Sequence, residues 1–594
     1  VLDITNNIIR QPILAITKTQ LVNTITLLEQ IEDEKYKEMI NGLFNDPLYY
    51  QHGALKIVSE KDRFSVAFIE WVNLCENYKP TDLVCRAFIN ELMELIGDSD
   101  TFIKFFNVAL DVSIESFNKS DPTGNVFNGI DALSFLVIQL LVFQDYKSDC
   151  VNDERLDFLK LVFLQFQSKF TIEHTFENFN ERPFFRFISI LLSYWQQLYV
   201  AEFDIISDKT TKDSLIAFNT DLYLATADVL HILQPLAFPG FTFAWISLIS
   251  HRMFLPIMLK TEGCKELFWK KLNLLLIDLF KFFVEYSNLG NESVDVLYKG
   301  TLRFVLLIAN DCPEYYIDNH YVLLNELPPN FKQIRNIICS AMPLNKVFPQ
   351  PMNQQIPIDY IPESCEYNPV SLVAPAQDLA TLKKPIDSYL RIPSSSLLRN
   401  INNQILAAKN ENSLIDFKFI NSIISHIVMQ AGDELVTTSK QAILNLTSSY
   451  FNLISNLITS NIQENKDIVY NILESLVNHL RFPNTQTYFV WYLLTTMFKL
   501  DLKDKTVSKK LNWDEEKLSL VQEMILRSLL ERLTIHKPHP WGCTVTFMTI
   551  LKNNDIESLS FMNEQDKNSK TYQLLTNIGR ILELPVNHEQ NVFA

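Results

Sequence analysis

The chain has 594 residues, more than one hydrophobic core usually serves, so its length predicts at least two packed units. Hydrophobic residues make up 47% of it and aromatic residues 12%, enough apolar material to oppose the entropy lost on folding. Its 69 acidic and 52 basic residues give a net charge of -17. This balance argues against direct nucleic-acid binding or an anionic-membrane surface, because phosphate contacts need clustered lysine and arginine.

Glycine and cysteine usage narrow the class of protein further. Only 12 glycines occur, which disfavours hairpins and phosphate-binding loops and favours helices. The eight cysteines are spread out with no CxxC pair, as is typical of reduced thiols in an intracellular protein. No apolar run reaches the roughly 18 to 20 residues that cross a bilayer. The chain opens VLDITNN, without an initiating methionine, so we expect it to be part of a longer protein.

Residues 1–341 are predicted to form a first stack of amphipathic helices. Apolar residues recur at helical spacing in successive blocks, and segment 270–285 is so apolar that neighbours must cover most of its sides. Bulky aromatics, as in NFNERPFFRF, suit helix pairs that bury two faces. The clearest predicted helices are 13–28, 64–75, 132–143, 156–166, 186–201 and 270–285.

Segment 342–393 differs from its flanks, because nine prolines interrupt any helical period. Proline lacks an N–H donor and clashes with the preceding turn, so we expect an extended connector here. Apolar residues at helical spacing return in 394–594, which we predict to be a second stack. The fold class is therefore all-α, with HEAT-like helical repeats in two stacks joined by a proline-rich connector. The helices predicted in the second stack are 414–430, 443–458, 468–480, 487–500, 521–533, 544–551 and 572–584.

The best candidates for chemistry are His536 and His539 in IHKPHPWG. The proline between them prevents the i, i+4 helical geometry of a zinc site, and no acidic residue lies beside them, so we predict no metal. Among enzyme hypotheses, a metal-dependent hydrolase using this pair needs the fewest further assumptions. The favoured interpretation is a corner between two helices, with Trp541 as a packing anchor and Gly542 permitting close approach.

No other pattern indicates an enzyme or a cofactor. Cys312 can be grouped with Asp311, Asp318 and His320, but no base beside it activates the thiol, and an inter-helix loop explains these residues better. A GxxxxG stretch at 124–129 lacks the lysine of a phosphate loop, and no GxSxG occurs. We therefore predict a non-enzymatic protein without cofactors, whose function lies in its surface. Aromatic residues beside a proline in RFPNTQTYFVWY could seat an extended peptide, and the candidates are Phe482, Tyr488, Trp491 and Tyr492.

Five segments carry a resemblance to a known family. They are PGFTFAWISLISHRMF (239–254), LYKGTLRFVLLIANDCPEY (297–315), LPPNFKQIRNIICSAMPLN (327–345), LRFPNTQTYF (480–489) and LLERLTIHKPHPWG (529–542). In this order and spacing they resemble the C-terminal region of the large NOT scaffold subunit of the CCR-NOT mRNA deadenylase complex. The resemblance covers about 210–560, and residues 1–200 are less diagnostic. The chain departs from the family pattern at Thr549, where an acidic residue is typical.

The resemblance implies a docking platform in mRNA decay and translational repression. Its partners would be two smaller NOT-box subunits with extended anchoring segments, and regulatory proteins that recruit the complex to mRNA stay open as further partners. It implies a cytoplasmic location, leaves a nuclear one open, and implies no membrane. To the four aromatics above we add Trp541, Phe241 and Arg252, from the same segments, as candidate partner-binding residues. The alternative hypothesis is a transport-receptor-like helical solenoid that binds protein cargo.

Overall fold

All elements in the described part of the chain are helices, which confirms the all-α prediction. The structure is a computed structural model. The predicted helices 13–28 and 572–584 lie outside the residues that it describes. The described residues are 60–78, 82–119, 128–143, 151–287, 290–344, 346–349, 379, 381–408, 416–437, 443–500 and 513–553.

The contacts divide the chain into two compact units, Val1–Leu275 and Leu276–Ala594. The boundary predicted at 342–393 lies at a different place, inside the second unit. The difference arises because the two helices between 313 and 339 pack on later helices of that unit, as the Tyr321 to Ser422 hydrogen bond of 2.9 Å illustrates. Whether two stacks meet at the proline-rich segment stays a prediction.

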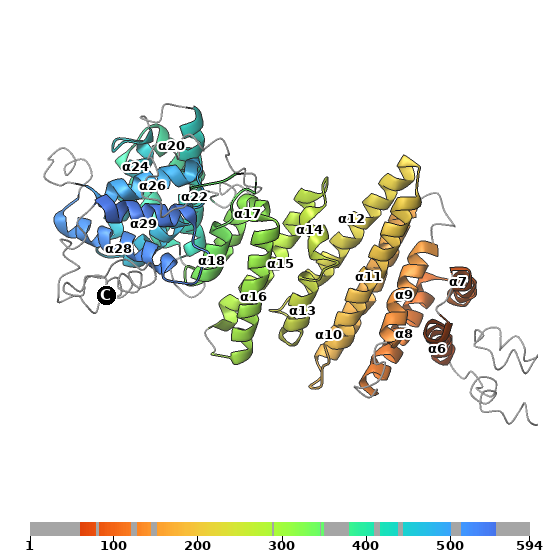
Figure 1. Ribbon diagram of the computed structural model, residues 1–594. Coiled ribbons are helices and arrows are strands. Elements are labelled where there is room, and N and C mark those ends of the chain that lie inside the picture. Colours follow the sequence, from red (N-terminus) through yellow and green to blue (C-terminus); the bar gives the residue numbers. More distant parts are fainter. Residues whose placement is uncertain are drawn as a thin grey trace, which may run out of the picture. The chain divides into compact units, whose positions relative to one another are not determined.

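The first unit is a two-layer repeat of helices (Figure 1). In one layer α6, α8, α10 and α12 pack in succession, and in the other α7, α9, α11 and α13 do so. Because each helix contacts its neighbour within the layer and helices of the opposite layer, this is the HEAT-like arrangement predicted for stacked helix pairs. The helices are α6 (Glu60–Tyr78), α7 (Asp82–Ile96), α8 (Ser99–Lys119), α9 (Asn128–Phe143), α10 (Val151–His174), α11 (Arg182–Ile205), α12 (Lys209–Ile232), η2 (Pro239–Phe241), α13 (Thr242–Ile249) and α14 (Leu255–Lys260), and α15 (Lys265–Tyr286) begins here and ends in the second unit.

Phenylalanine rings fill the space between the layers of the first unit. The ring of Phe166 stacks on that of Phe187 with centroids 4.9 Å apart, and Phe170 meets Phe184 edge-on at 5.0 Å. Phe184 and Phe187 belong to the phenylalanine run that the sequence assigned to core packing. Their burial confirms that assignment, and each such ring contributes about 1.5 to 3 kcal/mol through burial.

The second unit is built around α22, which contacts α17, α24, α25 and α26. One continuous hydrophobic core runs from Leu379 to Ile550. Ordinary caps start its helices: the Asn484 side chain accepts from the Thr487 N–H at the start of α26, and Asp514 does the same at α28. The helices are α16 (Glu292–Asp311), α17 (Pro313–Glu326), α18 (Lys332–Cys339), α20 (Lys383–Arg391), α21 (Ser395–Ala407), α22 (Phe417–Thr437), α24 (Ser449–Asn461), α25 (Lys466–Val477), α26 (Thr485–Phe498), α28 (Glu515–Leu533) and α29 (Trp541–Asn553).

One predicted helix began too early. The sequence placed a helix at 443–458, whereas α24 starts at Ser449. The Asn445 side chain accepts from the Thr447 N–H at 2.7 Å and from the Thr447 hydroxyl, which closes a turn in place of a helical first turn. The apolar residues before Ser449 have helical spacing, but this local turn ends the period.

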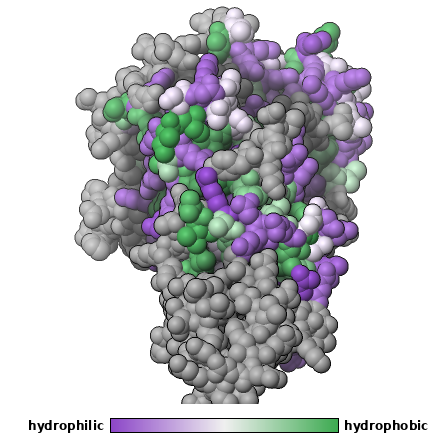
Figure 2. Space-filling model, turned by 90° about the vertical axis from the view of Figure 1, so that its right-hand side faces the viewer, coloured by the Kyte–Doolittle hydropathy of each residue, from purple (hydrophilic) through white to green (hydrophobic). Residues whose placement is uncertain are grey.

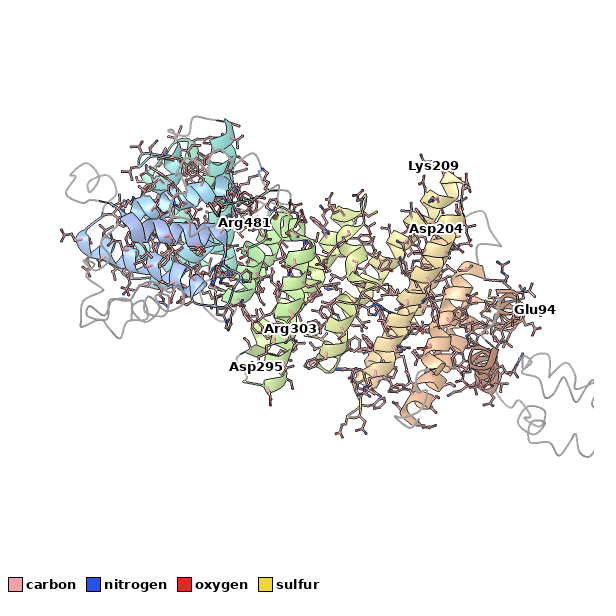
Figure 3. The ribbon with its side chains drawn as sticks, viewed as in Figure 1. Glu94, Asp204, Lys209, Asp295, Arg303 and Arg481 are labelled. Carbon is pink, nitrogen blue, oxygen red and sulfur yellow. The ribbon has the colours of Figure 1, made fainter. Side chains whose placement is uncertain are left out.

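Exposed apolar side chains are scattered over the described helices. Figure 2 shows one face, on which hydrophobic groups (green) lie among hydrophilic ones (purple). Exposed charged residues such as Glu94, Asp204 and Arg303 lie on helix surfaces, whereas Arg481 lies inside the second unit (Figure 3). No helix in the described residues is both long and apolar enough to span a bilayer. Exposed hydrophobic side chains alone therefore do not identify a docking site, and the contacts of the candidate residues are needed to locate one.

Candidate partner-binding site

Two of the recognisable segments meet in the second unit at a corner formed by 480–487 and 540–542. The Gly542 N–H donates to the Arg481 carbonyl at 2.6 Å, and the Thr487 hydroxyl donates to the His479 carbonyl at 2.8 Å. A side chain at Gly542 would place its Cβ 2.7 Å from the carbonyl carbon of Leu480 and 2.8 Å from the Arg481 oxygen. Backbone thus packs directly on backbone, as the sequence predicted for Gly542.

Trp541 and Phe482 lie at this corner beneath a segment of the same chain. Trp541 is 2% exposed, and its indole N–H donates to the Pro349 carbonyl at 2.7 Å. The Phe482 ring is 1% exposed and lies 6.2 Å from the ring of Phe348. Segment 346–349, which has no regular secondary structure, therefore contacts both aromatic residues. The anchor role predicted for Trp541 is confirmed, and partner contact by either residue stays a prediction.

The other three aromatic candidates lie together on α26. Trp491 is buried, and its indole N–H donates to the Thr549 hydroxyl at 3.3 Å. Tyr488 stacks on Trp491 with centroids 5.7 Å apart, while Tyr492 lies one turn further along. Tyr488 and Tyr492 are half-buried and keep part of their rings at the surface. Burial raises the pKa of the Tyr492 hydroxyl, so it stays a neutral hydrogen-bonding group at pH 7.

The two candidates in the first unit have different surroundings. Phe241 is fully buried, and its ring meets Phe170 at 4.8 Å within an aromatic cluster that includes Phe238. Arg252 lies exposed in the turn between α13 and α14. The structure thus makes Phe241 part of the core, whereas Arg252 is available at the surface. A contact of either with a partner stays a prediction.

A cluster of buried charges joins α18, α25 and α28, and sequence reasoning missed it. The Lys332 ammonium lies 2.7 Å from Glu474 and 3.1 Å from Glu531, and the Arg532 guanidinium lies 4.0 Å from Glu474. Glu474 and Arg532 are fully buried. Burial lowers the pKa of Lys332, against the opposing effect of Glu474. The cluster links the three helices, because each charge depends on the others for compensation.

Two buried histidines lie under the corner. His479 Nε2 is 3.1 Å from the Ser425 hydroxyl, and its ring centroid is 6.1 Å from that of His320. Burial and the neighbouring Arg481 charge lower the pKa of His479 to about 3. The same causes lower the pKa of His320 well below its usual value. Both imidazoles are therefore neutral in the folded protein at pH 7.

Acid should destabilise the second unit before the carboxylates titrate. Unfolded histidine has a pKa near 6.5, so below that pH the unfolded chain binds more protons, and the stability present above it is lost as pH falls towards 3. We expect His479→Gln to flatten the dependence of the unfolding free energy on pH by about 1.4 kcal/mol per pH unit between pH 6 and 5. Urea unfolding of the unmodified chain and of the His479→Gln variant at several pH values measures this pH dependence. Equal slopes would show that His479 does not control acid stability.

The histidine pair of the hydrolase hypothesis lies at the edge of the corner. His536 is exposed, and its backbone carbonyl accepts from Gln333 Nε2 at 2.8 Å. His539 is half-buried, and burial lowers its pKa. Across the described ranges, no group of three or more His, Cys, Asp or Glu side chains is placed to hold a metal ion. The pair therefore does not form a metal centre with described neighbours.

Residues 205–575, more than half of the chain, match the family described as "CCR4-Not complex component, Not1". The chain belongs to the Not1 family. The five-segment resemblance is therefore confirmed, and the match does not favour the transport-receptor alternative.

Individual proteins support the same conclusion. The general negative regulator of transcription subunit 1 of Saccharomyces cerevisiae is 39% identical over 556 residues, which are 91% of this chain and 25% of that protein. The CCR4-NOT transcription complex subunit let-711 of Caenorhabditis elegans is 25% identical over 518 residues, 82% of this chain and 18% of the relative. The chain thus spans about a quarter or less of the length of these relatives.

Solved structures cover most of the chain. A structure described as "Not1 C-terminal domain in complex with Not4" is 41% identical, with a TM-score of 0.75, covering 84% of this chain and 98% of that one. The NOT1 superfamily homology domain from Chaetomium thermophilum has a TM-score of 0.74 at 24% identity, covering 89% of this chain and 99% of that one. The latter shows the shared fold.

Proposed function

We propose that this chain is a non-enzymatic docking platform within a CCR4-Not scaffold subunit. It would hold two NOT-box subunits through their extended anchoring segments and so support mRNA deadenylation, decay and translational repression. The observation that carries the proposal is the match to nearly the whole of a Not1 C-terminal domain whose described partner is Not4. By that analogy we include a Not4-like subunit among the partners. We propose the cytoplasm as the main location of the protein and the nucleus as a second one.

The architecture suits this role. An extended partner loses conformational freedom when it binds, so it needs many contacts on a surface that does not itself rearrange. The buried cluster around Glu474 and the close backbone contact at Gly542 provide such rigidity in the second unit. Trp541 already binds non-helical backbone of the same chain, because its indole N–H donates to the Pro349 carbonyl.

We place the contact residues where the predicted candidates keep exposed area. Tyr488 and Tyr492 on α26 are half-buried, and Arg252 is exposed. Partly buried tyrosines suit binding, because the packed side of the ring is already ordered and the hydroxyl can bond a partner. Phe482, Trp491 and Trp541 then act as the packed support beneath this surface.

Co-expression tests the proposal. We expect the chain, produced with the two NOT-box subunits of its own organism, to co-purify with both at moderate salt, because apolar contacts resist screening better than surface charges. The readout is the composition of the affinity-purified complex after gel filtration. Recovery of the chain alone, with folded partners in the same lysate, would contradict the platform function.

A paired variant locates the site. Tyr488→Ala with Tyr492→Ala should weaken partner binding about tenfold or more, as expected when central interface aromatics are removed. Phe176→Ala is the matched control, because Phe176 is 55% exposed on the first unit and its loss should leave affinity unchanged. Circular dichroism must show that both variants keep their helices. Unchanged affinity in the tyrosine variant would show that the partner binds at a different surface.

A further inference from the structure

A cavity of about 530 Å³ opens on the second unit above the buried charge cluster. Its wall includes residues from three separate parts of the unit: Asn330 and Lys332 at the start of α18, Tyr470 and Asn471 on α25, and Glu531 on α28. This volume lies within the range of sites that hold small ligands, so it can accept a side chain with part of its peptide backbone. None of the seven partner-binding residues predicted from the sequence lines it.

The charges under the cavity do not balance. Within the part of the chain that the structure describes, Lys332, Arg527 and Arg532 pair with two carboxylates, those of Glu474 and Glu531. Arg335 adds a fourth cation to the cluster, where burial and the repulsion of Arg532 lower its pKa to about 10. Lys332 is 12% exposed, and Arg335 and Arg532 are fully buried, so a nearby anion would be attracted to these three more strongly than to cations at an open surface.

Glu531 does not cancel this excess at the wall. Its carboxylate accepts from the Tyr470 hydroxyl at 2.5 Å and from the Arg527 guanidinium at 3.1 Å, besides its ion pair with Lys332. Its charge is therefore directed into the cluster. The N-terminal end of α18 carries partial positive charge and lies at the same wall, which adds to the attraction for an anion.

Donors for hydrogen bonds come from the cavity wall itself. The Lys332 ammonium already faces Glu474, Glu531 and Tyr470, so it acts on an entering anion through its charge. The side-chain amides of Asn330 and Asn471 can each donate to a carboxylate. The Tyr470 ring and a proline at the wall supply apolar surface for the atoms beside the charged group.

We propose that this cavity binds an aspartate or glutamate side chain on an extended segment of a partner protein. The inference rests on the platform function and adds the chemistry of one contact. With a net charge of -17, the chain as a whole repels acidic ligands, so an acidic residue is favoured only where the local charge is positive. This contact would therefore fix the register of a partner segment along the unit.

Weak binding of a defined peptide to the purified chain tests the inference. Saturation-transfer NMR would follow Ac-Gly-Glu-Gly-NH2 and its glutamine analogue in parallel titrations. We expect the glutamate peptide to bind at least fivefold more tightly, and the preference to shrink at high salt. Equal binding of the two peptides would overturn the proposal. So would tighter binding of inorganic phosphate, followed by phosphorus NMR, because the cavity would then be a phosphate site.

Isosteric variants place the binding in the cavity. Asn471→Asp and Asn330→Asp each exchange a donor for a carboxylate, and should weaken the glutamate peptide about fivefold or more. Asn400→Asp on α21 is the matched control, because Asn400 is exposed, lies outside the cavity wall and should leave binding unchanged. Loss of affinity in the control alone, or in none of the three, contradicts the site. Co-purification with both NOT-box subunits alongside a negative peptide result would reject this contact and leave the platform function standing.

Discussion

The Gly542→Ala variant is expected to lose about 3 kcal/mol or more of the free energy of unfolding of the second unit. The added Cβ would lie 2.7 Å from the Leu480 carbonyl carbon, which is backbone and cannot turn aside as a side chain can. The Gly542 to Arg481 hydrogen bond would have to break or lengthen for the two segments to separate. Urea unfolding followed by circular dichroism measures the loss.

Gly300→Ala is the matched control for this variant. Gly300 lies within α16, and no heavy atom outside its immediate helix surroundings comes within 4 Å of an added Cβ. The same substitution there should stabilise the protein by about 0.5 to 1 kcal/mol, because alanine loses less backbone entropy than glycine in a helix. Equal effects at the two positions would mean that the corner is not closely packed.

Removing the buried carboxylate of Glu474 should also cost about 3 kcal/mol or more, because Lys332 and Arg532 would keep their charges with less compensation. Glu474→Gln keeps the shape of the side chain and removes only its charge. Glu464→Gln, at an exposed position before α25, should change stability by no more than about 0.5 kcal/mol. Thermal or urea unfolding distinguishes the two.

A double variant tests whether the charges act as a unit. Lys332→Met combined with Glu474→Met removes both members of one ion pair, whereas each single change removes one member and leaves the other without that partner. The loss of stability should therefore be smaller than the sum of the two single losses. Strict additivity would show that Lys332 and Glu474 do not compensate each other.

The sequence predicted what depends on local pattern. Helical spacing of apolar residues placed most helices, and proline and glycine at 538–542 predicted the corner because those residues restrict the backbone in known ways. The turn at Asn445 was missed, since its side-chain hydrogen bond competes with an otherwise helical pattern.

Contacts between distant segments were not predictable in the same way. Glu474 and Arg532 are 58 positions apart, and one charged residue in an apolar helix does not reveal its partner. Which side chains of α26 are buried could not be predicted either. Apolar residues occur on all sides of that helix, so the sequence does not distinguish the buried Trp491 from the half-buried Tyr488. The packing of α17 on α22 was not predictable for the same reason. A charge within an otherwise apolar helix, such as Glu474, is the one local signal that could have suggested the cluster.

The most direct test of the account is the mass of the purified assembly. Light scattering after gel filtration of the chain with both NOT-box subunits should give one peak whose mass equals one copy of each of the three proteins. A Tyr488→Ala and Tyr492→Ala chain should give a smaller fraction of that peak at the same concentration. Separate peaks for the unmodified chain and its folded partners would contradict the proposal that this chain is a docking platform.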